Sequence, residues 1–286
     1  MPVLLVVESL HYVFARLLLP HLPPVTGGLY MLAIATLQVG LLMRGRISLR
    51  TLLRHRWFFV TIGVLVAVNT NLGFVAMRYV DPGTAALLTR TSVIFGVALG
   101  VLWLGERLDG VELAGSALAV VGVILVSAQP GEYLRTGSIV VVAATFLYAL
   151  HSAVVKRYGG PIPFPEFFFY RLAMTSVFLV ILAAGQQALV WPTAGTWPLL
   201  ITAATVNVVI SRGLYYLALR RLDMNLLTII LTLSPIVTMV WAFGLFGSWP
   251  SPQEALGGLA ILAGVIVVSA RRGGYLGRVS PDTGTT

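Results

Sequence analysis

Residues 81–128 read DPGTAALLTRTSVIFGVALGVLWLGERLDGVELAGSALAVVGVILVSA. Residues 223–270 repeat this pattern without a gap, as DMNLLTIILTLSPIVTMVWAFGLFGSWPSPQEALGGLAILAGVIVVSA. When 76–128 is laid on 218–270, 14 of 53 positions are identical, and aspartate, glycine and glutamate are among them. Two unrelated apolar segments would share valine and alanine by chance, but they would not readily align these three residue types. We therefore interpret the chain as an internal duplication.

The composition is that of a membrane protein. Hydrophobic residues make up 58% and charged residues 10% of the 286 residues, whereas a soluble domain carries about a quarter charged residues. A chain so poor in charge needs lipid as the solvent for most of its surface. The chain has no cysteine, which excludes disulfides and thiolate sites. The net charge of +9 comes from basic residues between apolar runs, so we expect juxtamembrane arginines and no nucleic-acid partner.

Apolar runs divide the chain, and each is long enough to cross a hydrocarbon core of about 30 Å at 1.5 Å per residue. Helices satisfy their own backbone hydrogen bonds inside lipid, so the predicted fold is all-α, with ten transmembrane helices. Turn-forming segments such as PHLPP and RYGGPIPFPE separate the runs. The predicted helices are 2–19, 26–43, 57–77, 83–104, 111–128, 137–155, 164–184, 197–218, 224–246 and 253–270.

Arginine and lysine placement predicts the orientation. With a cytoplasmic N-terminus, 13 basic residues lie in inner loops and the tail and 3 in outer loops, as the positive-inside rule requires. Both termini are then cytoplasmic, in a cell inner membrane, and two five-helix repeats must be inverted relative to each other. The first repeat is predicted at 1–129 and the second at 137–271, with a disordered cytoplasmic tail at 272–286. The first run lacks a basic segment and a cleavage site, so we expect a retained helix rather than a signal peptide.

Ten helices as five plus five, with the loop sequence LGERL at 104–108, resemble the drug/metabolite transporter superfamily and its EamA-type branch. The similar stretches cover nearly the whole chain. They are AMRYVDPG (76–83), GSALAVVGVILV (115–126), YYLALRRL (215–222), LSPIV (233–237) and GGLAILAGVIVV (257–268). Two departures are Gly247-Ser248-Trp249, where the family often repeats G-E-R, and Arg90-Thr91-Ser92-Val93, where the second half keeps L-S-P.

The resemblance implies a secondary transporter, in particular an exporter of small metabolites such as amino acids. Binding sites in inverted repeats lie near the midplane between the repeats. We expect a cavity lined by 2–19, 57–77, 83–104, 137–155, 197–218 and 224–246. A nucleotide-sugar or phosphorylated-sugar exchanger is the alternative, and it predicts a cluster of basic residues facing the cavity. A membrane enzyme or a non-transporting receptor is the third hypothesis, although neither a P-loop nor an HExxH or GxSxG motif is present.

Arg90 is the leading candidate for the substrate site. It is eighth in its predicted helix, about 12 Å from the helix end, and a guanidinium at that depth needs a carboxylate or a hydrated cavity. It could anchor a carboxylate of the substrate or form a structural ion pair, for example with Glu8. Glu8 could instead be a protonatable coupling site or face headgroup water.

The other candidates are polar or aromatic residues inside the predicted helices, and each could equally be a packing or hydrogen-bonding residue. They are His11, Tyr12, Asn69, Asn71, Tyr148, His151, Asn207, Ser211 and Trp241. Arg171 and Arg212 lie near a helix end, so we expect both to extend to the headgroups. No cofactor or metal site is predicted.

The glycines at 115, 122, 257 and 264 predict close helix packing. Packing within the chain is the preferred interpretation, and homodimerisation is the alternative. Glu112 and Glu254 fall in first helical turns, where a carboxylate suits the helix dipole, so we interpret both as structural.

Overall fold

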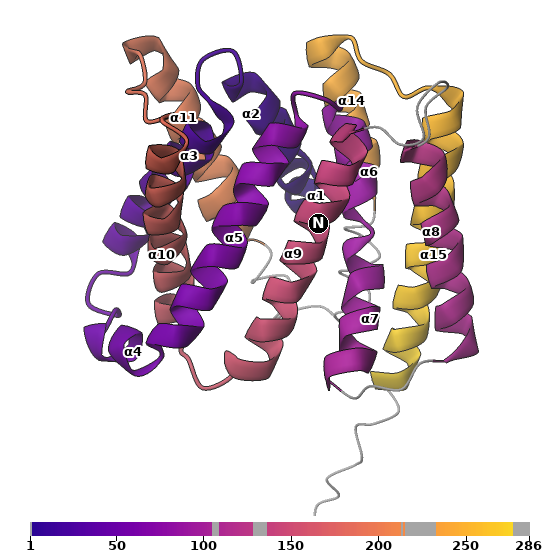
Figure 1. Ribbon diagram of the computed structural model, residues 1–286, viewed down its shortest axis with the longest axis horizontal. Coiled ribbons are helices and arrows are strands. Elements are labelled where there is room, and N and C mark those ends of the chain that lie inside the picture. The colour runs from indigo at the N-terminus through magenta and orange to yellow at the C-terminus, as the bar shows by residue number, and fades with distance from the viewer. Residues whose placement is uncertain (1, 105–108, 128–135, 213, 215–232, 277–286) are drawn as a thin grey trace, which may run out of the picture.

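The computed structural model describes residues 2–104, 109–127, 136–212, 214 and 233–276, and in this part of the chain every regular element is a helix. The long helices lie side by side as a bundle (Figure 1). Seven helices in the described ranges are long and apolar enough to cross a membrane. They are Pro24–Leu42 (α3), Arg56–Ala76 (α5), Pro82–Trp103 (α6 with most of α7), Gly110–Ser127 (α8), Thr136–Tyr158 (α9), Phe164–Gly185 (α10) and Pro252–Ala270 (in α15). The chain is therefore a multi-pass membrane protein, while the number of ten helices stays a prediction.

Three of the predicted helices are not continuous α-helices. The run 2–19 forms α1 (Pro2–Ser9) and α2 (His11–Leu18). The run 83–104 forms α6 (Pro82–Thr89) and α7 (Ser92–Leu104). The run 197–218 begins as α11 (Trp197–Ala203) and continues as the π-helix η2 (Ala204–Ile210). Hydropathy alone cannot show such interruptions, because an apolar sequence continues through each of them.

The remaining helices are short or lie late in the chain. They are α4 (Leu49–Arg54), the 3₁₀-helix η1 (Ala194–Thr196), α14 (Ser234–Phe246) and α15 (Pro252–Leu276). The predicted helix 224–246 is described only from 233 onward, and the loop 105–108 and most of the predicted tail lie outside the described residues.

Local sequence explains several helix ends. Asp81 caps α6, because its Oδ1 accepts the backbone N–H groups of Gly83 at 2.9 Å and Thr84 at 3.0 Å. Glu254 accepts from the backbone N–H of Ser251 at 2.8 Å, and the Ser251 hydroxyl accepts from the N–H of Glu254 at 3.2 Å. This reciprocal pair is a capping box.

Glu112 accepts in the same way from the backbone N–H of Asp109 at 3.1 Å. Glu112 and Glu254 therefore cap their helices, which confirms the structural role expected for both.

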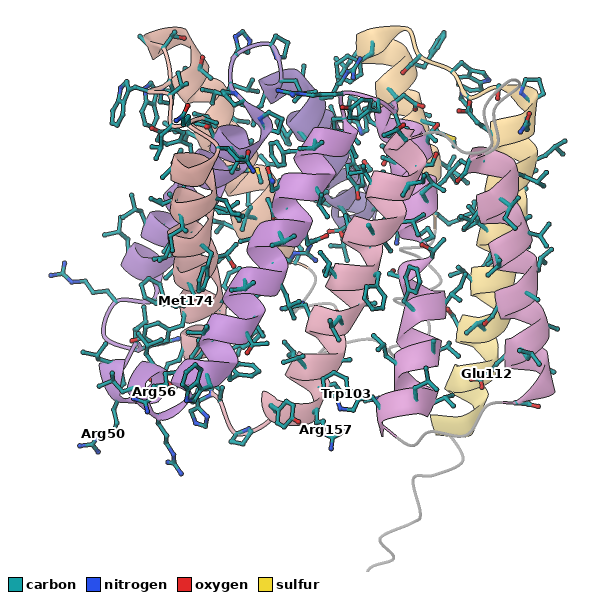
Figure 2. All side chains as sticks on the ribbon, viewed as in Figure 1. Arg50, Arg56, Trp103, Glu112, Arg157 and Met174 are labelled. Atoms are coloured by element: carbon teal, nitrogen blue, oxygen red, sulfur yellow. The ribbon has the colours of Figure 1, made fainter. Side chains whose placement is uncertain are left out.

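The two halves of the chain pack against each other along their length. Helices α9 and α10 contact α5, α10 also contacts α3, and α6 contacts α14. Arg50, Arg56 and Arg157 all lie at one end of the bundle (Figure 2). The clustering agrees with the predicted orientation, but which side of the membrane this end faces stays a prediction.

Glycines bring α8 and α15 into backbone contact at one edge of the bundle (Figure 1). A Cβ built on Gly122 would lie 2.5 Å from the carbonyl oxygen of Gly257, and one built on Gly264 would lie 2.3 Å from that of Gly115. The glycine stripes therefore pack within the chain, as preferred from the sequence. The reciprocal pattern, in which 115 meets 264 and 122 meets 257, is the one a two-fold axis between two related helices produces.

Candidate functional site

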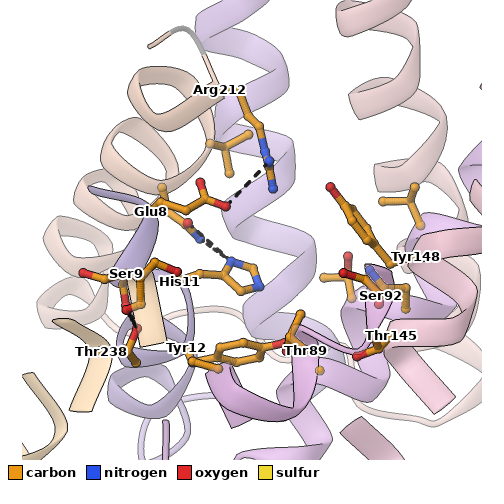
Figure 3. A pocket seen from close by; sticks show the side chains of 18 of the residues that line it. Glu8, Ser9, His11, Tyr12, Thr89, Ser92, Thr145, Tyr148, Arg212 and Thr238 are labelled. Carbon is orange, nitrogen blue, oxygen red and sulfur yellow. Dashed lines mark hydrogen bonds and ion pairs between the residues drawn. The ribbon is translucent and has the colours of Figure 1, made fainter. Parts of the chain in front are cut away.

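A cavity of about 300 Å³ lies inside the bundle. Side chains from all six predicted lining helices reach it, and so do Met31 and Leu32 of α3, Arg171 and Leu172 of α10, and Val265 of α15. Figure 3 shows Tyr148 of α9 facing Glu8, His11 and Tyr12 across the open space. Both halves of the chain therefore contribute to one polar interior space.

The helix interruptions lie at this cavity. Around Arg90 the backbone forms i→i+3 hydrogen bonds, from Arg90 N to Leu87 O at 3.0 Å and from Val93 N to Arg90 O at 3.2 Å. At the break between α1 and α2 the carbonyl of Ser9 accepts a hydrogen bond from the hydroxyl of Thr238 at 3.0 Å. Short 3₁₀ and π segments inside helices often accompany functional sites, and non-helical backbone at membrane depth is tolerated only inside protein or beside water.

Arg90 has an incompletely satisfied guanidinium. Its Nη2 donates to the hydroxyl of Ser234 on α14. Its Nε is buried and has no hydrogen-bond partner among the residues that the structure describes. A buried N–H without an acceptor is costly, and more so on a charged group. The geometry is suited to an acceptor supplied by a ligand.

Glu8 is paired with Arg212 rather than with Arg90. The carboxylate accepts from the hydroxyl of Ser211 at 2.7 Å, and its other oxygen lies 3.9 Å from Nη1 of Arg212. Figure 3 shows the Glu8–Arg212 pair at the cavity wall. Glu8 is therefore part of a polar cluster inside the bundle.

Two further contacts join the broken helices to the rest of the wall. The amide nitrogen of Asn207 lies 3.0 Å from Nδ1 of His11. The hydroxyl of Tyr12 lies 2.6 Å from that of Thr89. These bonds hold α2 against η2 and α6.

The expectation that Arg171 and Arg212 extend to the headgroups is wrong, because both line the cavity. Arg171 also donates from Nε to Nε2 of His151 at 3.3 Å. Depth along the helix suggested the surface for both, but helix rotation directs them inward. Among the described residues, three arginines, including Arg90, therefore line the cavity together with one carboxylate, that of Glu8.

Seven of the eleven predicted site residues line the cavity, namely Glu8, His11, Tyr12, Asn69, Arg90, Tyr148 and Asn207. Ser211 contacts the cavity residue Glu8, and His151 contacts the cavity residue Arg171. Asn71 and Trp241 are absent from its wall, and the Asn71 Oδ1 and Trp241 Nε1 atoms are buried without a partner among the described residues. Sequence reasoning missed polar wall residues on α6, α7, α9 and α14, namely Thr89, Ser92, Thr145, Ser234 and Thr238.

Within the described ranges, no group of three or more histidine, cysteine, aspartate or glutamate side chains is arranged to hold a metal ion. The cavity instead offers hydrogen-bond donors and three guanidinium groups. Such a set can bind a small anionic or zwitterionic molecule.

The fold and this interior cavity are those of a membrane transporter, and comparison with known proteins identifies the family. Residues 3–128 and 135–270 each match the EamA-like transporter family. The chain therefore belongs to the EamA-like transporter family, within the drug/metabolite transporter superfamily, and the resemblance noted from the sequence is confirmed.

Relatives with assigned names are transporters. A protein of Streptantibioticus cattleyicolor named "Probable terminal-alkyne amino-acid exporter" is 33% identical over 203 residues, which cover 68% of this chain and 66% of that protein. That match spans slightly under two thirds of the relative's length. A protein of Salmonella typhimurium named "Probable amino-acid metabolite efflux pump" is 26% identical over 279 residues, covering 92% of this chain and 91% of that protein.

A solved crystal structure is similar across 94% of this chain and 96% of its own, with a TM-score of 0.66 and 20% sequence identity. At that identity the likeness concerns the fold alone.

Proposed function

We propose that this chain is a secondary transporter that exports small amino-acid-type metabolites by alternating access through the central cavity. The observation that carries the proposal is the buried Nε of Arg90, which has no partner among the described residues, in a cavity walled by both halves of the chain. Two relatives carry names that specify amino-acid export or efflux. The volume of about 300 Å³ is at the low end for ligand pockets and suits a small metabolite.

In this proposal Arg90 anchors the substrate carboxylate. A planar guanidinium binds a carboxylate with two parallel hydrogen bonds, and a lysine ammonium cannot reproduce that fork. Ser234 accepts one hydrogen bond from Nη2, and the Nε–H is a further donor that a ligand carboxylate would satisfy.

Glu8 is the proposed coupling residue. Protonation would remove its negative charge and with it the pairing to Arg212 at 3.9 Å. Because that pair joins α1 to the segment after η2, a proton on Glu8 would loosen a contact between the two halves. The proposed arrangement further includes two inverted five-helix repeats, with both termini on the cytoplasmic side of the inner membrane.

One observation favours a second candidate function. Arg90, Arg171 and Arg212 line the same cavity, which is the cluster expected of an exchanger for nucleotide sugars or phosphorylated sugars. Glu8 neutralises part of this charge, and the small volume argues for the amino-acid class.

Counterflow in proteoliposomes tests both candidates. Vesicles loaded with one unlabelled solute from a panel of amino acids, sugar phosphates and nucleotide sugars are mixed with the same labelled solute. We expect accumulation of amino acids and loss of it in Arg90→Ala, with Arg90→Lys keeping a fraction. Losing one charge-assisted hydrogen bond corresponds to about 10- to 100-fold weaker apparent affinity.

Exchange of sugar phosphates alone would replace the first candidate by the second. Equal exchange in wild type, Arg90→Lys and Arg90→Ala would remove Arg90 from the substrate site. Absence of counterflow for the whole panel would count against both candidates.

A further inference from the structure

His151 of α9 and Arg171 of α10 form a hydrogen-bonded pair beside the cavity. The Arg171 Nε donates to Nε2 of His151 at 3.3 Å. Arg171 lines the cavity, whereas His151 is absent from its wall and is 7% exposed. The histidine therefore contacts a cavity residue from within the packed protein.

This hydrogen bond fixes the protonation state of the imidazole. An arginine Nε always donates, so Nε2 must present its lone pair and the ring must be neutral, with its one proton on Nδ1. The Nδ1 atom is buried and has no hydrogen-bond partner among the described residues. Among the described residues, Arg171 is therefore the hydrogen-bond partner that favours this tautomer.

A second proton on the ring would face other cations. The described groups that act electrostatically on His151 are Arg171 and Arg212, both positive, and the Tyr148 ring lies 6.0 Å away on the same helix. Protonation at Nε2 would replace the accepting lone pair by an N–H and set an imidazolium against the Arg171 guanidinium.

The other helices that pack on α9 contain few ionisable residues. The one ionisable residue of α5 is Arg56, which is the first residue of that helix. The one ionisable residue of α8 is Glu112, in its first turn. Neither α6 nor α7 contains an ionisable residue, although Arg90 lies between them.

We propose that His151 is a positioning residue with two states: while neutral it holds Arg171 in the cavity wall for substrate binding, and on taking up a proton it releases Arg171. Proton binding at Nε2 and substrate binding at Arg171 then exclude each other, which is the relation that an exchange of protons for substrate requires. The inference rests on the proposed function in one respect, namely that Arg171 is part of the substrate site.

Nitrogen NMR of the histidine side chains tests the pair without any substrate. The full chain, labelled with ¹⁵N-histidine, is reconstituted in nanodiscs at about pH 8, above the usual titration range of histidine. The signal that disappears in His151→Gln is assigned to His151. We expect a neutral ring protonated at Nδ1, and loss of this preference in Arg171→Met. A ring protonated at Nε2, or an unchanged tautomer in Arg171→Met, would overturn the proposal.

Exchange measurements test the coupling. The probe is the amino acid with the highest counterflow in the panel above, assayed between about pH 5 and pH 8. Glutamine can place its amide oxygen near the Nε2 position, whereas asparagine is one carbon shorter and serves as the matched control. At the upper pH we expect the apparent affinity of His151→Gln for the amino acid to stay within about 3-fold of wild type. At the lower pH the affinity of wild type should fall, whereas that of His151→Gln should not. His151→Asn should bind the amino acid about 10-fold more weakly than wild type across the whole pH range.

A pH profile that is identical in wild type and His151→Gln would overturn the coupling. If no solute in the panel exchanges, the proposed function fails while the NMR result still decides whether His151 holds Arg171.

Discussion

Adding one methyl group at Gly264 should force α8 and α15 apart. The new Cβ would lie 2.3 Å from the carbonyl oxygen of Gly115 and 2.7 Å from the backbone nitrogen of Ala119, whereas ordinary contact begins at 3.4 Å. Both neighbours are backbone atoms, so no rotamer change can relieve the overlap. The helices must separate by about 1 Å at this crossing, a gap that forfeits a quarter to a half of the dispersion energy of the atoms concerned.

The expected cost follows from two opposing effects. Overpacking typically costs about 1–3 kcal/mol, while replacing a helical glycine by alanine recovers about 0.5–1 kcal/mol. The net destabilisation of Gly264→Ala is therefore about 1 kcal/mol, within a range of about 0–2.5 kcal/mol. Gly96 of α7 is the matched control, because a Cβ there meets no atom of the described residues within 4 Å. Gly96→Ala should stabilise the protein by up to about 1 kcal/mol.

Reversible unfolding in mixed micelles titrated with sodium dodecyl sulfate, followed by tryptophan fluorescence, measures these differences. Gly122 is the repeat equivalent of Gly264, and its Cβ would lie 2.5 Å from the oxygen of Gly257. We expect Gly122→Ala and Gly264→Ala to lose similar stability. If either behaves like Gly96→Ala, the backbone contact between α8 and α15 is not formed in the protein.

Two other predictions concern coupling and topology. Glu8→Gln removes the charge that pairs with Arg212, so counterflow should persist while its dependence on an imposed pH gradient weakens several-fold; an unchanged dependence would exclude Glu8 from coupling. The chain contains no cysteine, so Ser48→Cys before α4 and Ala194→Cys at the start of η1 provide single labelling sites at exposed positions between the long helices. A membrane-impermeant maleimide added to intact cells should label Ala194→Cys and not Ser48→Cys, and the reverse result would invert the predicted orientation.

Much of the fold could be predicted because lipid imposes simple rules. Apolar length locates the long helices, and capping residues such as Asp81 and Glu254 mark where helices begin. The breaks at Leu10 and Arg90 have no such signal, since neither glycine nor proline lies at the break in either run. Both breaks are hydrogen-bonded to α14, where Ser234 accepts from Arg90 and Thr238 donates to the carbonyl of Ser9, and such long-range contacts cannot be read from one sequence.

The candidate site was only partly predictable, because one sequence does not give helix rotation. Asn69 and Asn71 are two positions apart on α5 and so point to nearly opposite faces. That spacing allows only one of them to face the cavity, and the structure places Asn69 there. Arg171 and Arg212 were assigned to the headgroups from their depth along the helix, although depth does not specify the direction of a side chain.

The interruption between α6 and α7 has a mechanical consequence. A continuous helix transmits rotation and translation along its whole length, as a rigid rod does. Around Arg90 the backbone has i→i+3 bonds in place of the regular pattern, so α6 and α7 can tilt with different amplitudes about this point. The same holds for α1 and α2 at Leu10. In the alternating access that we propose, these two breaks are the pivots beside the cavity, about which one end of the bundle opens while the other stays packed.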